Sequence, residues 1–523
     1  MNRRSFLGNL LTLEEVNNSG VNDTNSILAN DLEAYLPDVK SPWDVIRAGH
    51  LLRRTTFMPR WQDLDSILKL TPDKAVDLLL DTQSKPKDPS VANTITESRD
   101  GLDITLRKGL EGQWTAAWSQ LQTWQTEVMR TSGLSIGEKL TAFWSNHFTT
   151  EFVNDDDFIV APLLFRQNRL LREQGLNNFR DLAYNITLDG GMVIYLGGEV
   201  NKAGVPNENY ARELMELFTI GIGQYTEGDV QNAARILTGW KVARYTDQPS
   251  PNGQFNSYFL PSQHDIGAKE FLGVSFPARD ANTNTEFIVK QEEIKKLIDV
   301  IFDKRGDAAS VFLCKKLYRF FVCANPLKVN MGVVNAMAKI MKENDFDLKP
   351  VISALLKSKH FFDNNNIGSQ LKTPLDFVIG LSRQIASPST NLPQDISKLG
   401  QELFDPPNVS GWNGWHDWIT TTTYPIRDKI SQNSIAALTD SLAMSFINQF
   451  PNKEDLDSLI VNLCAILLPR ALSNERKTFL KSKLTGGAPD YEWKQIMNDS
   501  VTAGRNIREL LNSIVQLPDF QLC

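Results

Sequence analysis

Apolar side chains recur at intervals of three and four residues along most of this chain, from near Pro42 onward. Such spacing places apolar side chains on one face of an α-helix, which can then pack against other helices. Residues 239–285 differ, because short apolar runs there alternate with Pro and Gly, a pattern typical of a small β-ribbon. The sequence therefore predicts a mainly α fold, a large multi-helix body of about fifteen helices with one small β-ribbon insertion.

The same patterns divide the chain into four parts. Residues 12–40 are polar, rich in Asn and without periodicity, and we expect residues 1–40 to form a disordered lead-in with a twin-arginine-like N-terminus. We expect residues 41–238 to form a helical N-terminal half, residues 239–285 the ribbon insertion, and residues 286–523 a helical C-terminal half packed with the first as one body. A chain of 523 residues, of which 41% are hydrophobic, is long enough to bury a large core.

Two local signals mark helix starts. Pro72 follows Thr71, and Pro is favoured in the first turn of a helix because its missing N–H would have no partner there. Thr226 and Asp229 have the spacing of a capping box, in which each side chain binds the backbone N–H of the other residue. We therefore expect helices to begin at both places.

The composition argues against several classes of protein. Lys and Arg number 55 and Asp and Glu 62, so the net charge of −7 gives no basic surface for nucleic acid. No run of 18 apolar residues is present, so no membrane span is predicted. The four cysteines form no CxxC pair, which argues against a structural zinc site and against a disulfide scaffold.

The N-terminal residues bear on localisation. Arg3, Arg4 and the Phe6-Leu7 pair resemble a twin-arginine export signal. The apolar segment that should follow is short, because it runs into Glu14. We expect a periplasmic or extracellular protein, with a cytoplasmic location as the alternative.

The densest group of candidate functional residues lies in residues 206–218. Asn207 suits a helix N-cap, and Glu208, Arg212 and Glu216 follow one another at four-residue spacing. One interpretation is an exposed ladder of ion pairs, which adds little to stability. The other is that Glu208 and Glu213 project into a cleft as a carboxylate pair, able to bind a metal or to act as acid and base, with Arg212 orienting the substrate.

Two histidines extend this hypothesis. His147 lies near the end of an aromatic-rich helix, and His264 with Asp265 lies in the Gly- and Pro-rich stretch, where loops often carry function. Each histidine can equally be a hydrogen-bonded structural residue. The GxSxG, Walker, HExxH and strand-associated GxGxxG motifs are absent, so reaction, cofactor and metal stay open.

Three tryptophans, Trp412, Trp415 and Trp418, lie in one turn-rich segment. Exposed rings would suit stacking on sugars. Buried rings would belong to an ordered loop that covers a core.

Several segments of the chain are similar to one large bacterial family, called domain of unknown function 1800. Together they extend from about residue 45 to the C-terminal residues. The segments are Leu51-Leu52-Arg53-Arg54-Thr55-Thr56-Phe57, Phe143-Trp144-Ser145-Asn146-His147-Phe148, the run from Pro206 to Gly223, Leu237-Thr238-Gly239-Trp240, His264-Asp265-Ile266-Gly267-Ala268-Lys269, Pro406-Pro407-Asn408-Val409-Ser410-Gly411-Trp412 and Leu517-Pro518-Asp519-Phe520-Gln521.

The resemblance implies a helix-rich, extracytoplasmic protein, often encoded beside a partner that looks like an alkaline-phosphatase or sulfatase-fold protein. It implies no known reaction. The family pattern has a second histidine where this chain has Ser145, which puts a two-histidine metal site in doubt.

Three functional hypotheses follow. The first is an interaction or scaffold partner of a co-secreted envelope protein, which predicts an exposed apolar patch. The second is a hydrolase acting on an envelope or extracellular polymer, which predicts that Glu208, Glu213, Arg212, His147, His264 and Asp265 converge in one pocket. The third, a carbohydrate-binding body, predicts that the three tryptophans share one exposed face.

Overall fold

The structure is a computed structural model that describes residues 32–89, 114–153, 160–243, 256–389 and 391–523. Helices dominate it, and its strands form two small two-stranded sheets, so the expected mainly α fold is confirmed and the expected number of helices is roughly right. Most of the expected lead-in, including the twin-arginine-like residues, lies outside the described residues. No helix in the described ranges has both the length and the hydrophobicity of a membrane span.

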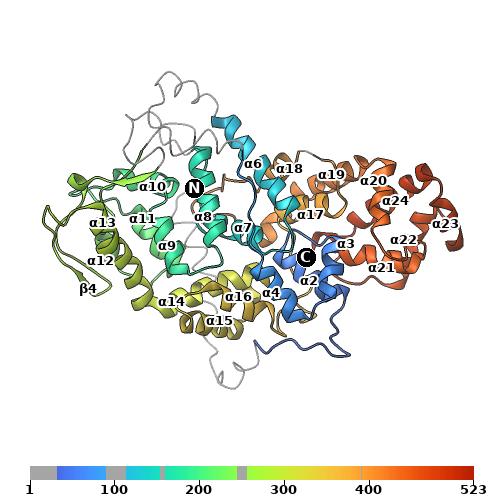
Figure 1. The fold of residues 1–523 in the computed structure, drawn as a ribbon, viewed down its shortest axis with the longest axis horizontal. Helices are drawn as coiled ribbons and strands as arrows, with labels where there is room; N and C mark the ends of the chain where they lie inside the picture. Colours follow the sequence, from blue (N-terminus) through green and yellow to red (C-terminus); the bar gives the residue numbers. More distant parts are fainter. Residues whose placement is uncertain (1–31, 90–113, 154–159, 244–255, 390) are drawn as a thin grey trace.

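The molecule is elongated, and its middle is built mainly from N-terminal helices (Figure 1). These helices are α2 (Val45–Thr55), α3 (Trp61–Leu68), α4 (Pro72–Asp81), α6 (Trp114–Thr131), α7 (Gly137–His147) and α8 (Ala161–Gln174). Helix α17 (Pro374–Gln384) packs against α6, and α21 (Leu456–Leu467) packs against α2 and α3. The C-terminal part of the chain therefore contacts the N-terminal part directly.

The remaining helices form the two ends and one long edge of the molecule (Figure 1). One end holds α9 (Phe179–Thr187), α10 (Gly190–Tyr195), α11 (Asn209–Glu213), α12 (Glu227–Ile236) and α13 (Glu286–Val289). The edge holds α14 (Lys296–Phe321), α15 (Met331–Glu343) and α16 (Leu348–Leu356). Helix α18 (Leu392–Lys398) lies beside the central helices, and the other end holds α19 (Thr423–Ala436), α20 (Asp440–Asn448), α22 (Asn474–Thr485), α23 (Trp493–Ile496) and α24 (Ser500–Val515).

The four strands lie within the stretch predicted as a ribbon. Strand β1 (Trp240–Val242) pairs antiparallel with β2 (Ser257–Phe259), and β3 (Lys269–Phe271) pairs antiparallel with β4 (Val274–Phe276). The second pair is a tight hairpin, in which Gly273 has a φ of +77° that side-chain-bearing residues rarely adopt. Strand β3 also packs against α12, which joins the hairpins to the helical body.

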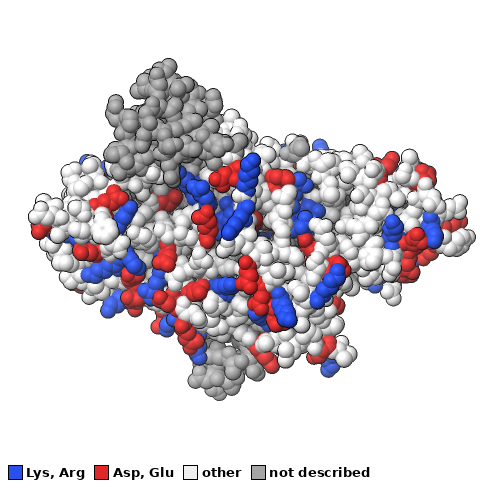
Figure 2. Space-filling view, in the orientation of Figure 1, with Lys and Arg blue, Asp and Glu red and all other residues white. Residues whose placement is uncertain are grey.

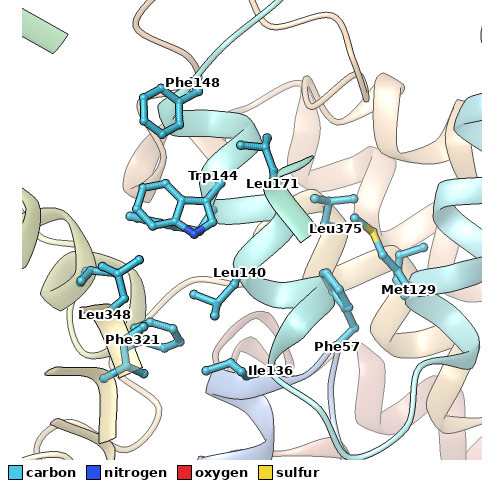
Figure 3. Packing of buried hydrophobic residues seen from close by; sticks show 14 of the residues in the cluster. Phe57, Met129, Ile136, Leu140, Trp144, Phe148, Leu171, Phe321, Leu348 and Leu375 are labelled. Atoms are coloured by element: carbon cyan, nitrogen blue, oxygen red, sulfur yellow. The ribbon is translucent and has the colours of Figure 1, made fainter. Parts of the chain in front are cut away.

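Helix α7 lies at the centre of the core. Its residues Leu140 and Trp144 are buried and lie between side chains from several helices (Figure 3). The labelled neighbours come from α6 (Met129), α8 (Leu171), α14 (Phe321), α16 (Leu348) and α17 (Leu375). Trp144 also donates its Nε1 hydrogen to the Gly175 carbonyl at 2.7 Å, which fixes the ring.

Candidate functional site

The densest candidate segment forms a short α-helix that continues as a π-helix. Helix α11 ends at Glu213, and the π-helix η4 spans Leu214–Thr219. Its wider turn is visible in the bond from the Ile220 N–H to the Met215 carbonyl at 2.9 Å. A π-helix is rare and often occurs at functional sites, and its last carbonyl groups have no partner within the helix.

His147 and Lys316 bind these last carbonyl groups. His147, at the end of α7, donates from Nε2 to the Phe218 carbonyl at 2.9 Å. Lys316, on α14, donates from Nζ to the Leu217 carbonyl at 2.9 Å and to His147 Nδ1 at 3.0 Å. His147 therefore has its proton on Nε2 and accepts at Nδ1, because a carbonyl oxygen and an ammonium group leave no other arrangement.

Burial changes the acidity of both groups. It lowers the pKa of His147 well below 6.5, and the nearby Lys316 lowers it further. Burial also lowers the pKa of Lys316 to about 7, with a smaller contribution from Arg319. The imidazole is surrounded by aromatic rings of Phe143, Trp144, Phe148, Phe179, Phe218 and Phe312. His147 is therefore a neutral, buried group that joins α7 to η4.

Glu208 and Arg212 lie on the surface of α11. Arg212 Nη2 is 3.3 Å from Glu208 Oε2, and the guanidinium makes two bonds to Glu227 of α12, at 3.0 and 2.7 Å. The hydrogen bond to Glu227 raises the pKa of Arg212. Asn207 is not the cap itself, since Glu208 holds that position, but its Oδ1 accepts the Asn209 N–H at 3.0 Å. Glu208 and Arg212 therefore belong to an ion-pair network that joins α11 to α12.

Glu213 is separated from that network by burial. Its exposed fraction is 4%, and its charge acts on two tyrosines, Tyr195 and Tyr225. Tyr225 donates to Glu216 at 2.6 Å, and Tyr195 lies 3.5 Å from Glu151 Oε2. In the structure Glu208 is ion-paired with Arg212, whereas Glu213 is buried.

Two acids close to Tyr195, Glu151 and Asp405, and a third close to Asp405, Glu402, were missed by the sequence analysis. Burial raises the pKa of Asp405 to about 6, and the charges of Glu151 and Glu402 raise it as well. Glu151 and Asp405 also raise the pKa of Tyr195, after burial. No sequence signal could have found this group, because Glu151 lies far in the sequence from Glu402 and Asp405. Only the position of Asp405 directly before Pro406 links it to a recognised segment.

His264 and Asp265 belong to a second place in the structure. His264 is buried, and its Nδ1 donates to the Thr238 carbonyl at 3.0 Å. The Asp265 N–H donates to Thr238 Oγ1 at 2.8 Å. Asp265 forms two bonds with Arg235, at 2.8 and 3.2 Å. These bonds attach the loop that carries both residues to the end of α12.

Behind this loop, buried Glu293 lies on a second π-helix, η6 (Lys290–Lys295). Its carboxylate accepts from Lys269 at 2.9 Å and from Arg279 at 2.5 Å, and it lies 3.5 Å from His264 Nε2. Burial alone would raise the pKa of Glu293, but His264 and Lys269 hold it at about 2. Both predicted histidines therefore contact a π-helical segment, which the sequence did not predict.

The structure places the six predicted residues in several different surroundings. His147 binds η4, and Glu208 and Arg212 form an ion pair on the surface. Glu213 is buried near two tyrosines, and His264 and Asp265 are bound by Thr238 and Arg235. Across the described ranges, no three His, Cys, Asp or Glu side chains are placed to hold a metal ion.

The segment with three tryptophans is fixed by Asn146. Asn146 Oδ1 accepts the Trp412 N–H at 2.7 Å, and its Nδ2 donates to the Trp412 carbonyl at 3.3 Å. Gly411 has a φ of +75°, and a Cβ there would lie 2.2 Å from Asn146 Oδ1, so only glycine fits. Trp418 is buried, so the three rings do not share one exposed face as sugar binding would require.

A comparison with known protein families matches residues 50–522 to the family described as "Protein of unknown function (DUF1800)". The chain belongs to this family. Searches of curated proteins and of solved structures gave no match. The DUF1800 match covers all the segments quoted above, which confirms the resemblance found in the sequence.

Within this DUF1800 protein, the recognised segments bind one another. Asn146 and His147 of one segment hold Trp412 and Phe218 of two others. Thr238 holds both His264 and Asp265. Arg53 donates to the Ala465, Ile466 and Leu468 carbonyls at the end of α21, and Arg54 donates to the Val322 carbonyl at 3.0 Å. Many polar side chains of these segments therefore form hydrogen bonds that join distant parts of the chain.

Proposed function

We propose that this protein is an interaction or scaffold partner of a co-secreted envelope protein, located in the periplasm or outside the cell. The mutual binding of the recognised segments carries the proposal. A side chain whose hydrogen-bonding atoms are already used within the fold has little capacity left for a substrate. Asn146, His147 and Thr238 are of this kind.

An exposed apolar surface at one end of the molecule supports the same function. Val200, Val205 and Phe287 have exposed fractions of 65%, 66% and 75%, and Ile266 is exposed nearby. Hydrogen bonds join the segments that carry these residues. The Ala203 N–H binds the Gln263 carbonyl, and Asn284 Nδ2 binds the Pro261 carbonyl, both at 2.8 Å. We call Val200, Val205, Ile266 and Phe287 the end patch. Several exposed apolar side chains on adjoining segments are typical of a surface that another protein covers.

The family resemblance indicates the partner to test, a protein of alkaline-phosphatase or sulfatase fold encoded beside this one. We expect the two purified proteins to form a complex that elutes as one species in size-exclusion chromatography with light scattering. Replacing Val200 and Phe287 together with Ser should weaken the complex at least tenfold, about 1.4 kcal/mol, by removing apolar area from the interface.

The matched control changes the same residue types at the other end of the molecule. Val501 and Phe479 are also exposed, at 63% and 52%, and lie on α24 and α22. Replacing both with Ser should leave the complex unchanged. The proposal would be wrong if the purified pair formed no complex, or if both double variants weakened it equally.

A hydrolase acting on an envelope or extracellular polymer is the second candidate, and the acids around Tyr195 favour it. A carboxyl group with a pKa near 6, such as Asp405, can donate a proton near neutral pH. If this candidate is right, the protein will cleave an envelope polysaccharide or peptide, and Asp405→Asn will lower the rate at least a hundredfold with the fold intact. Equal cleavage rates for the native protein and Asp405→Asn would show that Asp405 is not the acid.

A further inference from the structure

A cleft of about 510 Å³ lies beside α6 and α8, away from the residues considered so far. The apolar part of its lining, which we call the floor, includes the buried Leu80, Ile136 and Leu140, and polar and charged side chains line the rest. The chain that follows α4 forms one wall, and α8 forms another. This volume lies within the range of small-molecule sites in proteins.

Two arginines of α8 stand over an aromatic pair in this cleft. Trp124 and Phe165 meet edge to face with ring centroids 5.6 Å apart. The Arg172 guanidinium carbon lies 5.2 Å from the centre of the Trp124 ring, and that of Arg169 lies 5.2 Å from the centre of the Phe165 ring. Stacking of this kind holds a guanidinium flat and leaves its edge available for an anion.

Arg172 is anchored but not fully used. Its side chain is 5% exposed, and its Nε and Nη2 donate to buried Glu138 at 2.6 and 3.1 Å, with a further bond from Nη2 to Gln125. The Glu138 carboxylate also accepts a hydrogen bond from the Ser84 hydroxyl at 2.6 Å, so it has donors besides Arg172. Within the described residues, Arg172 Nη1 has no hydrogen-bond partner, although Arg172 lines the cleft.

Arg169 is only loosely neutralised. Its nearest carboxylate oxygen, on Asp88, is 3.7 Å away, beyond hydrogen-bond distance. By contrast, Lys349 on the opposite rim binds Asp81 at 2.6 Å. Glu173 also lines the cleft and limits how much negative charge it accepts. Basic and acidic side chains alternate over this face of the molecule, without one large area of a single charge (Figure 2).

We propose that this cleft binds an amphipathic anion, with a single anionic head at Arg169 and Arg172 and an apolar body on the floor of the cleft. Two guanidinium groups spaced along one helix suit the oxygens of a carboxylate or phosphate head. The apolar floor then favours a hydrocarbon body over a free inorganic ion. The proposal is independent of the function proposed above.

Isothermal titration calorimetry of the full chain with octanoate, octyl phosphate and 1-octanol tests this site. We expect one bound octanoate or octyl phosphate per chain, and an affinity for neutral 1-octanol at least tenfold lower. The tighter of the two anions identifies the head group. The proposal is overturned if neither anion binds, or if 1-octanol binds as tightly as they do.

Variants of Arg169 locate the binding, because this side chain is 42% exposed and its loss should not unfold the protein. Arg169→Gln should weaken anion binding at least tenfold, and Arg169→Lys, which keeps the charge, should weaken it less. Arg180→Gln is the matched control, because Arg180 also stands over aromatic rings and pairs with exposed acids, but it lies outside the cleft lining. Equal affinity in the native protein and Arg169→Gln would disprove the assignment.

Discussion

Replacing Glu293 with Gln is expected to lower the free energy of unfolding by about 3–5 kcal/mol, the usual cost of breaking a buried ion pair. The carboxylate is buried and accepts from both Lys269 and Arg279. The substitution leaves Lys269 as a buried cation with no charge partner. Urea denaturation followed by circular dichroism measures the loss.

The same carboxylate predicts how stability depends on pH. Its pKa is about 2 in the folded protein, against 4.5 when unperturbed. A carboxyl with a depressed folded pKa stabilises the fold above its unfolded pKa, and the contribution is lost as the pH falls from about 4.5 toward 2. The native protein should therefore lose stability over this range, and Glu293→Gln should lose much less.

Glu292→Gln is the control for both measurements. Glu292 is the next residue, is 64% exposed and binds the same Arg279 at 2.9 Å. An exposed pair of this kind contributes less than about 1 kcal/mol. If the two variants were equally stable, the buried cluster would not have the role that its geometry indicates.

The second large effect is expected for His147→Ala, which should lower the free energy of unfolding by about 3 kcal/mol or more. The substitution leaves a cavity among aromatic rings, removes the donor to the Phe218 carbonyl and leaves Lys316 with one acceptor fewer. The loss should be measured as a lower urea midpoint. Because folding lowers the pKa of His147, its contribution is present above the unfolded pKa of 6.5 and is lost as the pH falls below it.

Ser145→Ala on the same helix provides the comparison. Ser145 is partly exposed and donates only to the Thr141 carbonyl one turn earlier. Its loss should change stability by less than about 0.5 kcal/mol, as surface substitutions usually do. A His147→Ala variant as stable as Ser145→Ala would show that η4 does not depend on the imidazole.

Local features of the fold could be predicted from the sequence because neighbouring residues determine them. Helix α4 begins at Pro72, and the capping box of Thr226 and Asp229 opens α12 as expected. The ribbon stretch contains all the strands that the structure describes, because Pro and Gly interrupt helical spacing there.

The candidate site could be predicted only in part, because its contacts join distant segments. The sequence indicated His147 but not Lys316, and His264 but not Glu293, since the partners lie on helices that spacing alone cannot bring together. The two π-helices could not be predicted either. A π-helix has the apolar pattern of an ordinary helix, and its wider turn is held by tertiary contacts such as those from His147 and Lys316 to η4.

Helix α7 also bears on how the protein is made. Asn146 and its partner Trp412 are 266 residues apart in the sequence, and His147 and Lys316 are 169 apart. During synthesis, the end of α7 therefore emerges long before either partner exists, and contacts this distant in sequence form slowly. A fragment ending before Trp412 would leave Asn146 without its loop, so the end of α7 depends on the second half of the chain to complete its contacts.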